Sequence, residues 1–450
     1  MRTLFGTDGV RGKANAYPIN PETVLQLGKA LARVFKASGH GSQRAVIGKD
    51  TRLSGYMLET ALTSGLVSMG MDVYLVGPLP TPAVAHLTRS MVAGCGIMIT
   101  ASHNPADDNG IKVFGTDGFK LTDALEEEVE KYVLEGGISS AHIPNDQLGK
   151  AYRIDDARGR YIEFAKSTVP DLDLHGLKVV VDCANGAAYL LGPIILRELG
   201  AQVIKLATDP DGYNINDGCG ATAPDAVCRK VREVGADLGV AFDGDADRVV
   251  FCDRHGDVIH GDRILALCAL ALKEQGRLRR DTAVVTVMTN LGFHRAMAAR
   301  GIRTVTTPVG DRHVIDCMRR EGYSFGGEQS GHLIFMDHAT TGDGIVSALQ
   351  VLRLMGRAGT SVNDLTGFME IYPQKLVNVP VREKRDLAQL PELAAATREC
   401  AAALGDDGRQ LVRYSGTEKS LRILVEAVRQ ADVDHWSARL AAAAQREIGV

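Results

Sequence analysis

The sequence predicts an α/β fold with four domains, and three observations support this prediction. A chain of 450 residues exceeds the roughly 250 to 300 residues at which a single hydrophobic core stops growing. An order of apolar strand, helix ending in glycine and second apolar strand occurs three times. After about residue 370 this order changes. We therefore expect three related α/β domains followed by a smaller α+β domain.

The three repeated units share one order of elements and lie at 44–77, 177–207 and 282–310. A glycine suits the left-handed residue that ends a helix, and each unit has one there, at Gly70, Gly200 and Gly301. Strand, helix, strand over this length is the βαβ crossover, so the two strands of each unit should lie parallel and side by side. Coincidence is an alternative, because this order recurs in all α/β proteins, and function must therefore be argued from sites.

The C-terminal part of the chain shows a different order of elements. We predict a strand at 375–381, a helix at 391–404, a strand, a loop at 414–420, a strand at 421–428 and a helix at 433–448. Together with the repeats, this order predicts domains at 1–152, 153–253, 254–369 and 370–450.

Composition and charge exclude several classes of protein. The apolar fraction of 45% and the charged fraction of 24% are ordinary for a globular chain. A net charge of -4 leaves no broad basic face for nucleic acid or anionic lipid, which favours a small ligand whose phosphate is held locally. Eight scattered cysteines without a CxxC pair indicate buried thiols, and no apolar stretch has the length of a signal peptide or membrane span. We expect a cytoplasmic protein that binds neither nucleic acid nor membrane.

The first segment whose residues could take part in a reaction is Thr100–Pro105, which follows an apolar run at 97–99. Ser102 should therefore stand where a buried strand ends and a substrate can reach it, with His103 beside it. Lys112 follows ten residues later, where the chain can return to the same loop, and is a candidate proton donor or acceptor. The segment contains no GxSxG elbow, so Ser102 is no triad serine. An ordinary turn is the alternative, because Ser, Asn and Pro all favour turns.

The second segment crowds three carboxylates, those of Asp243, Asp245 and Asp247, between apolar runs at 238–242 and 249–252. Their mutual repulsion is costly unless a cation is bound, and a hard, oxygen-preferring ion such as Mg²⁺ fits. An EF-hand is excluded, because Arg248 stands where the EF-hand loop requires glycine. A solvated acidic turn is the remaining alternative.

Two further segments are rich in hydrogen-bonding groups. In Gly326–His332, the side chains of Glu328, Ser330 and His332 could bind the hydroxyls of a sugar, although a polar turn with a satisfied histidine is equally compatible. In the other of these two segments, at 413–418, a guanidinium, hydroxyls and backbone amides suit a phosphate dianion, with a surface turn as the alternative. Its residues are Arg413, Ser415, Gly416 and Thr417.

These four segments occur in the order serine loop, acidic loop, sugar-type loop and phosphate-type loop, one in each predicted domain. With FGTDGVRG near the N-terminus, the ordered set resembles the α-D-phosphohexomutase family along essentially the whole chain. The resemblance implies four domains around a central cleft, the last of a TATA-binding-protein-like type. It also implies a phosphoserine at Ser102 and one Mg²⁺ held by Asp243, Asp245, Asp247 and an oxygen of that phosphate.

The resemblance further assigns roles to other residues. Lys112, Arg248 and Arg11 should lie by the transferred phosphate, and His103 is a further catalytic candidate. Glu328, Ser330 and His332 should bind the sugar. Arg413, Ser415, Gly416 and Thr417 should hold the phosphate that does not react.

The implied activity is the interconversion of a sugar 6-phosphate and its 1-phosphate, through a sugar 1,6-bisphosphate that is both intermediate and activator. Gln329 and the segment at 309–314 favour the amino-sugar branch of the family, because the mannose and glucose enzymes commonly have Met at the position of Gln329. The expected substrate is glucosamine 6-phosphate, and a homodimer is a family-level expectation. Glucose or mannose specificity, a non-catalytic phosphosugar sensor and a metal-dependent phosphatase are the alternatives.

Overall fold

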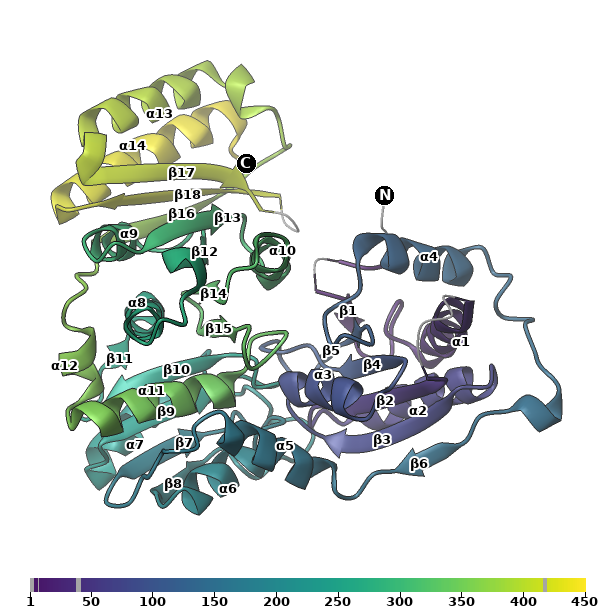
Figure 1. The fold of residues 1–450 in the computed structure, drawn as a ribbon. Coiled ribbons are helices and arrows are strands. Elements are labelled where there is room, and N and C mark those ends of the chain that lie inside the picture. The colour runs from purple at the N-terminus through teal and green to yellow at the C-terminus, as the bar shows by residue number, and fades with distance from the viewer. Residues whose placement is uncertain (1–3, 7, 38–41, 416–418) are drawn as a thin grey trace. The chain divides into compact units, whose positions relative to one another are not determined.

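The computed structural model describes residues 4–6, 8–37, 42–415 and 419–450 (Figure 1). The chain groups into two compact units. The larger unit extends through Met288 and includes Ile302–Thr366, whereas the smaller unit consists of Thr289–Gly301 and Gly367–Val450. Three sheets lie in the larger unit and one lies in the smaller unit.

The first sheet has the strand order β1-β5-β4-β2-β3-β6. Its strands are β1 (Val10–Lys13), β2 (Arg44–Lys49), β3 (Asp72–Pro78), β4 (Cys95–Ile99), β5 (Asp108–Phe114) and β6 (Ala151–Arg153). The helices are α1 (Pro21–Ala37), α2 (Ser54–Val67), α3 (Thr81–Ser90) and α4 (Asp123–Leu134). Strands β4, β2, β3 and β6 run parallel, and β5 and β1 are antiparallel to their neighbours.

The second sheet has the order β11-β10-β9-β7-β8. Its strands are β7 (Lys178–Asp182), β8 (Gln202–Leu206), β9 (Leu238–Phe242), β10 (Val249–Asp253) and β11 (Val258–Ile259). Its helices are α5 (Ala157–Ser167), α6 (Leu191–Glu198) and α7 (Asp225–Val234).

The third sheet has the order β13-β12-β14-β15. Its strands are β12 (Thr282–Thr286), β13 (Arg303–Thr307), β14 (Phe325–Glu328) and β15 (His332–Phe335). The helices of this part of the chain are α8 (Gly261–Glu274), α9 (Leu291–Ala298), α10 (Asp311–Glu321), α11 (Gly344–Ala358) and α12 (Val362–Thr366).

All three sheets contain the same core of four strands. The orders β3-β2-β4-β5, β8-β7-β9-β10 and β13-β12-β14-β15 each join three parallel strands to a fourth antiparallel one. In each, the first two strands along the chain are the parallel pair of a βαβ unit. The predicted repeat and its parallel pairing are therefore confirmed.

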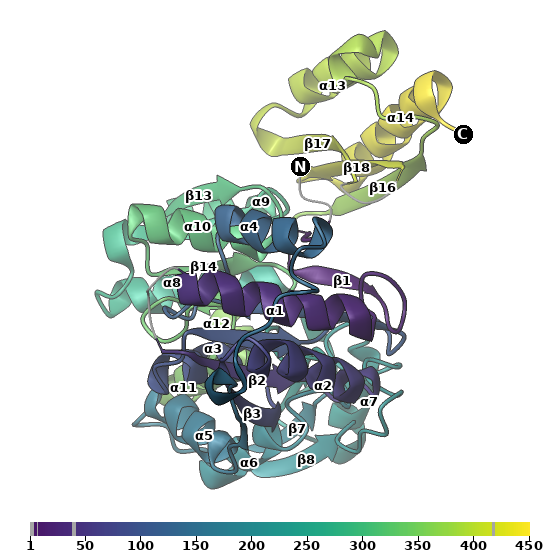
Figure 2. The ribbon, with the colours of Figure 1, turned by 90° about the vertical axis from the view of Figure 1, so that its right-hand side faces the viewer.

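The first sheet shows how the residue pattern places helices on both faces. Ala45 and Ile47 of β2 join the apolar core with α1 and α2, whereas a Cβ at Gly48 would lie 2.4 Å from Val84 of α3. Successive strand residues point to opposite faces, so α3 covers the face opposite to α1 and α2. In Figure 2, α4 lies alongside α1, and both contribute to this core.

The sheet of the smaller unit is antiparallel, with the order β16-β18-β17. Its elements are β16 (Gln374–Pro380), α13 (Pro391–Leu404), β17 (Gly408–Tyr414), β18 (Ser420–Ala427) and α14 (Gln430–Ile448). The apolar faces of both helices pack on the sheet in one core. This arrangement confirms the predicted smaller α+β domain, and its helices and strands lie within a few residues of the predicted ranges.

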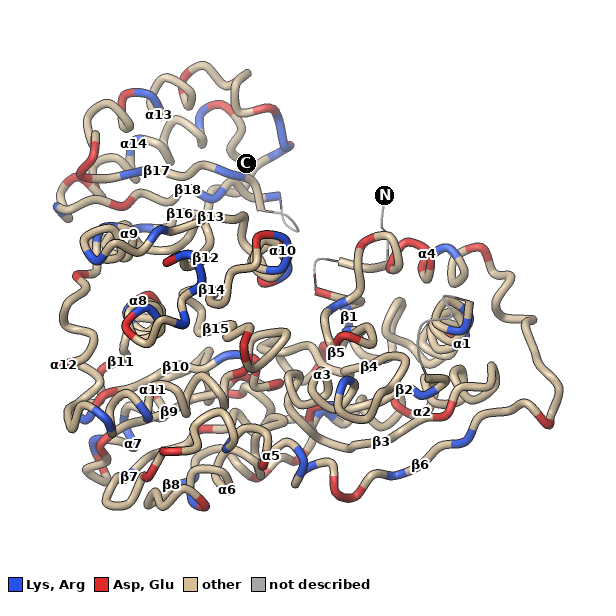
Figure 3. Tube along the Cα trace, viewed as in Figure 1, with Lys and Arg blue, Asp and Glu red and all other residues tan. Residues whose placement is uncertain are grey.

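Charge and burial agree with a globular protein. Acidic and basic residues are interspersed over all parts of the chain drawn in Figure 3. All eight cysteines are buried and free, as the sequence predicts. None of the helices in the described part of the chain combines the length and apolar character that crossing a bilayer requires.

Candidate active site

Three of the four predicted segments occupy equivalent places in the repeated sheets. The segment with Ser102 connects β4 to β5, the acidic segment connects β9 to β10, and the turn 329–331 connects β14 to β15. Each is thus the link between the third parallel strand and the antiparallel strand of its sheet. The repeat therefore presents three different chemical groups from the same position of the fold.

Ser102 lies three residues beyond Ile99, the last residue that β4 pairs with β5. It adopts a positive φ of 51°, which is uncommon for a residue other than glycine, and its side chain is buried. The Ser102 hydroxyl donates a hydrogen bond to Oδ2 of Asp243 at 2.7 Å. The loops also touch through their backbones, since a Cβ at Gly244 would lie 2.5 Å from the carbonyl oxygen of Ser102. The serine loop and the acidic loop therefore form one site.

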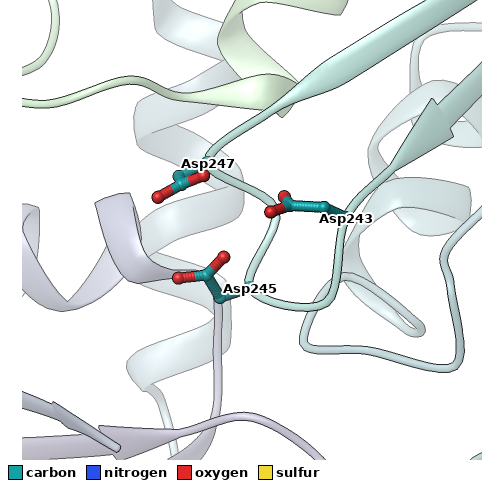
Figure 4. Close-up of side chains that lie close together, drawn as sticks. All are labelled: Asp243, Asp245 and Asp247. Atoms are coloured by element: carbon teal, nitrogen blue, oxygen red, sulfur yellow. The ribbon is translucent and has the colours of Figure 1, made fainter. Parts of the chain in front are cut away.

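The carboxylates of Asp243, Asp245 and Asp247 converge, as Figure 4 shows. All three are buried, and one oxygen of each lies within 4.8 Å of the others. Oδ1 of Asp245 and Oδ1 of Asp247 have no hydrogen-bond partner among the described residues. Burial, reinforced by Asp247 and Asp245, raises the pKa of Asp243 well above its usual value. Buried carboxylate oxygens without donors are costly, so the group fits a bound hard cation, with Mg²⁺ as a suitable ion.

Lys112 lies on β5 and enters this acidic group. Its Nζ is 2.8 Å from Oδ2 of Asp245, 3.1 Å from Oδ2 of Asp247 and 3.4 Å from Oδ2 of Asp8. Burial disfavours its charge, but these three carboxylates outweigh burial and raise the pKa of Lys112 well above its usual value. The amine therefore stays protonated and leaves the Oδ1 atoms of Asp245 and Asp247 available to a cation.

Arg11, His103 and Arg248 surround the serine. Nη1 of Arg11 lies 3.4 Å from the carbonyl oxygen of Ala101. Nδ1 of His103 is 3.4 Å from the Ser102 hydroxyl oxygen and 3.1 Å from Nη1 of Arg248. Burial and the two arginines lower the pKa of His103 to about 4, so its ring is neutral near pH 7. Because Nδ1 faces the Arg248 donor, this nitrogen acts as an acceptor.

The third loop brings its predicted residues to different places. Glu328, at the end of β14, accepts a hydrogen bond from the amide of Gly310 at 2.9 Å. Ser330 is exposed in the turn. His332 is buried, with Nδ1 3.5 Å from Oδ1 of Asp247 and Nε2 3.1 Å from the amide nitrogen of Gly342. Its ring thus contacts the acidic loop directly.

The fourth segment belongs to the smaller unit. Arg413 on β17 is half-buried and stands opposite Arg422 of β18. Burial and Arg422 lower the pKa of Arg413, as expected where two cations are held side by side. Ser415 is buried, and its carbonyl oxygen accepts a hydrogen bond from Nζ of Lys384 at 2.7 Å. Gly416 and Thr417 lie outside the described residues.

Sequence reasoning missed several charged and polar residues at this site. Asp8 pairs with Arg11, Lys112 and Lys120, and Lys120 also pairs with Asp311 at 2.5 Å. Thr81, at the start of α3, donates to Oδ2 of Asp245 at 2.6 Å. Asp8 stands inside the FGTDGVRG segment, which was a usable signal. Thr81 and Lys120 carry no local signal, because only the tertiary fold brings them to the site.

Comparison with known proteins agrees with this site. The four domains of the phosphoglucomutase/phosphomannomutase family match the chain in sequence order. Its alpha/beta/alpha domains I, II and III match residues 2–137, 159–256 and 260–372, and its C-terminal domain matches residues 376–443.

Individual relatives cover the whole chain. The phosphoglucosamine mutase of Geobacter sp. (strain M21) is 52% identical over 450 residues, which is 100% of this chain and 99% of the relative. A crystal structure of a phosphoglucomutase/phosphomannomutase family protein from Burkholderia thailandensis has a TM-score of 0.83 at 24% identity and covers 99% of both chains. The N-acetylphosphoglucosamine mutase of Aspergillus fumigatus, in complex with GlcNAc-6P and magnesium, has a TM-score of 0.69 at 20% identity, covering 99% of this chain and 96% of that one.

At these identities, the two solved structures demonstrate a common fold alone. The four domain matches and the curated relative of 52% identity add the family. The chain belongs to the phosphoglucomutase/phosphomannomutase family, the α-D-phosphohexomutases, which are isomerases that move a phosphoryl group within a sugar.

Proposed function

We propose that this enzyme interconverts glucosamine 6-phosphate and glucosamine 1-phosphate through a phosphoserine at Ser102. The product would feed the synthesis of UDP-N-acetylglucosamine and the cell wall. The observation that carries the proposal is the contact of 2.7 Å between the Ser102 hydroxyl and Asp243, inside a group of three buried carboxylates. The full-length identity of 52% with a phosphoglucosamine mutase supports the choice of sugar.

We propose Mg²⁺ as the metal ion, one per active site. Asp243, Asp245 and Asp247 would hold it together with an oxygen of the phosphate on Ser102. Bound there, the ion would offset negative charge on the phosphoryl oxygens during transfer. The two carboxylate oxygens without hydrogen-bond partners support this assignment, as does the presence of magnesium in the Aspergillus fumigatus complex.

The chemical steps follow from a phosphorylated Ser102. O1 of the 6-phosphosugar attacks the phosphorus atom and the bond from phosphorus to Oγ breaks. The proton lost by O1 is matched by the one that Oγ takes up, so the products are the 1,6-bisphosphate and the free Ser102 hydroxyl. After the bisphosphate has turned over, Oγ attacks the phosphorus at C6, the bond from phosphorus to O6 breaks, and O6 gains a proton as Oγ loses one, which releases the 1-phosphate and restores phosphoserine. Arg11, Lys112 and Arg248 would position the transferred group, and neutral His103 lies close enough to exchange a proton with Oγ.

The remaining residues would bind the rest of the substrate. Glu328, Ser330 and His332 are proposed for the sugar, and His332 would act from its place against Asp247. The other phosphate is assigned to Arg413, Ser415, Gly416 and Thr417. The cross-strand placement of Arg413 opposite Arg422 supports anion binding there, since it brings two cationic side chains to one face of the sheet.

Three broader predictions complete the proposal. The domains are taken as 1–152, 153–253, 254–369 and 370–450. We expect a cytoplasmic homodimer whose ligand is a small phosphosugar, with the sugar 1,6-bisphosphate as activator of the enzyme and intermediate of the reaction.

Phosphorus NMR tests the proposal with Mg²⁺, catalytic sugar 1,6-bisphosphate and, in separate tubes, the 6-phosphates of glucosamine, glucose and mannose. Glucosamine 1-phosphate should form fastest. Faster conversion of glucose or mannose phosphate would overturn the substrate assignment. Net release of inorganic phosphate would indicate a phosphatase, and binding without conversion would indicate a sensor.

A further inference from the structure

A fully buried ion pair lies behind the serine loop and has no part in the chemistry described above. Asp50 and Arg52 follow directly after β2, and neither side chain has solvent-exposed surface. Nε of Arg52 donates to Oδ2 of Asp50 at 2.9 Å, and the backbone amide of Arg52 donates to Oδ1 at 3.0 Å. Burying such a pair carries a large desolvation cost, so an ion pair is a poor choice for stabilising a core.

The remaining donors of Arg52 all point to the serine loop. Nη2 donates to the carbonyl oxygens of Ser102 at 3.0 Å and Asn104 at 2.8 Å, and Nη1 donates to the carbonyl oxygen of Pro105. One guanidinium therefore holds three carbonyl groups of a single turn. A lysine could not do this, because it lacks the planar fork of donors.

The amide of Ser102 is tied to the same ion pair from the other side. It donates to Oγ1 of Thr100 at 2.9 Å, and that hydroxyl donates to Oδ2 of Asp50 at 2.7 Å. The carbonyl oxygen of Ser102 is thus hydrogen-bonded to Arg52, and its amide is connected to Asp50 through Thr100. The residue held in this way has a φ of 51°, a conformation that persists only when its surroundings enforce it.

A second residue binds the same turn from the connection between β8 and α7. Nδ2 of Asn216 donates to the carbonyl oxygen of Ser102 at 2.9 Å and to that of Asn104 at 3.0 Å. Asn216 and Arg52 therefore share two acceptors. The serine turn is fixed both to its own sheet and to the part of the chain that carries the acidic loop.

We propose that Asp50 and Arg52, acting through Thr100, are positioning residues that hold Ser102 in its left-handed conformation and so keep Oγ at the acidic loop. This inference rests on the proposed role of Ser102 as the phosphoryl carrier. Without the hydrogen bonds from Arg52 and Thr100, the turn relaxes toward ordinary φ values and Oγ moves away from Asp243. Such a shift lowers the rate of transfer and leaves the groups that bind the sugar untouched.

The test compares Thr100→Val with Thr100→Ser. Valine keeps the shape of threonine but removes both hydrogen bonds, whereas serine retains them. Thr100→Val should lower kcat about 10- to 100-fold with KM for glucosamine 6-phosphate within about twofold, because small misplacements of reacting groups have effects of this size. Thr100→Ser should recover most of the rate. Thr60→Val, on the exposed face of α2, is the matched control and should retain wild-type kcat.

Arg52→Lys provides a second variant, which keeps the charge beside Asp50 and loses the fork of donors. It should show the same fall in kcat, and it gives the answer if Thr100→Val fails to fold. Wild-type kcat per folded molecule in Thr100→Val or Arg52→Lys, even with a lowered Tm, would overturn the positioning role. So would a rise in KM at unchanged kcat. Mass spectrometry tests the proposed function separately: wild-type enzyme that carries no phosphoserine at Ser102 after incubation with sugar 1,6-bisphosphate would overturn that function instead.

Discussion

Replacing Gly244 with alanine tests the contact between the serine loop and the acidic loop with a single added methyl group. The backbone at Gly244 is acceptable to alanine, since its φ is not positive. The added Cβ, however, would lie 2.5 Å from the carbonyl oxygen of Ser102 and 2.8 Å from Nδ2 of Asn216. Cβ atoms essentially never come within 3.0 Å of another group, so at least one loop must shift by about half an ångström or more.

The expected size of the effect follows from this overlap. Overpacking a well-filled region by one methyl group typically destabilises by about 1 to 3 kcal/mol. The displaced groups carry Ser102 and the three carboxylates, and a misplacement of about 1 Å at reacting groups can lower a rate about 100-fold. We therefore expect Gly244→Ala to fold with a reduced Tm and to lose at least tenfold in kcat.

The assay measures formation of glucosamine 1-phosphate at saturating substrate, together with thermal unfolding. The control is Gly159→Ala, on the exposed face of α5, where an added Cβ meets nothing within 4 Å. It should retain full activity and gain about 0.5 to 1 kcal/mol of stability from the better helix propensity of alanine. Wild-type kcat and Tm in Gly244→Ala would refute the close contact of the two loops.

Two further substitutions test buried carboxylates. Asp343, at the start of α11, accepts hydrogen bonds from the Val346 amide and the Tyr161 hydroxyl, and burial raises its pKa to about 6. The folded protein therefore holds this proton more tightly than the unfolded chain, and the resulting stability is present below pH 3.8 and lost as pH rises through about 6. Asparagine can form both hydrogen bonds without a charge. The free energy of unfolding of Asp343→Asn, measured in urea, should therefore rise relative to that of the wild type by up to about 3 kcal/mol between pH 4 and pH 8. A difference that does not depend on pH would contradict this. Asp245→Asn should weaken Mg²⁺ binding at least about tenfold in calorimetric titration, since the charge of the ligands governs such affinities. Asp257→Asn, at an exposed position, is the control. An unchanged Mg²⁺ affinity in Asp245→Asn would exclude Asp245 as a ligand.

Local pattern was sufficient to predict the repeated units and the acidic loop. The apolar runs at 238–242 and 249–252 became β9 and β10, and the three aspartates lie in the turn between them. The reason is that a buried strand needs a continuous apolar run, and a short polar interval between two such runs leaves room only for a turn. The smaller α+β domain was predictable for the same reason.

Contacts between distant segments were beyond this reasoning. Short β1 pairs with β5 almost 100 residues further along the chain, and this pairing is what brings Arg11 and Asp8 to the site. Thr81 reaches Asp245 across 164 positions. No periodicity in the sequence records such pairings, because they depend on the order of strands in the sheet.

The equivalence of the three loops also needed the structure. Each loop has a different composition, and their common position between the third and fourth strands follows only from the sheet orders. His332 is a related case. Its place in a glycine-rich turn predicts contact with a sugar, and the contact of its ring with Asp247 became visible only in the structure.

Transfer of a phosphoryl group through Ser102 is the central claim, and a single-turnover chase tests it most directly. Enzyme loaded by sugar 1,6-bisphosphate and freed of small molecules should carry one phosphoryl group, which peptide mass spectrometry should locate on Ser102. Addition of glucosamine 6-phosphate with Mg²⁺ should remove this group within one turnover and form glucosamine 1,6-bisphosphate, and Ser102→Ala should neither load nor turn over. Loading at another residue, or full turnover by Ser102→Ala, would contradict the account.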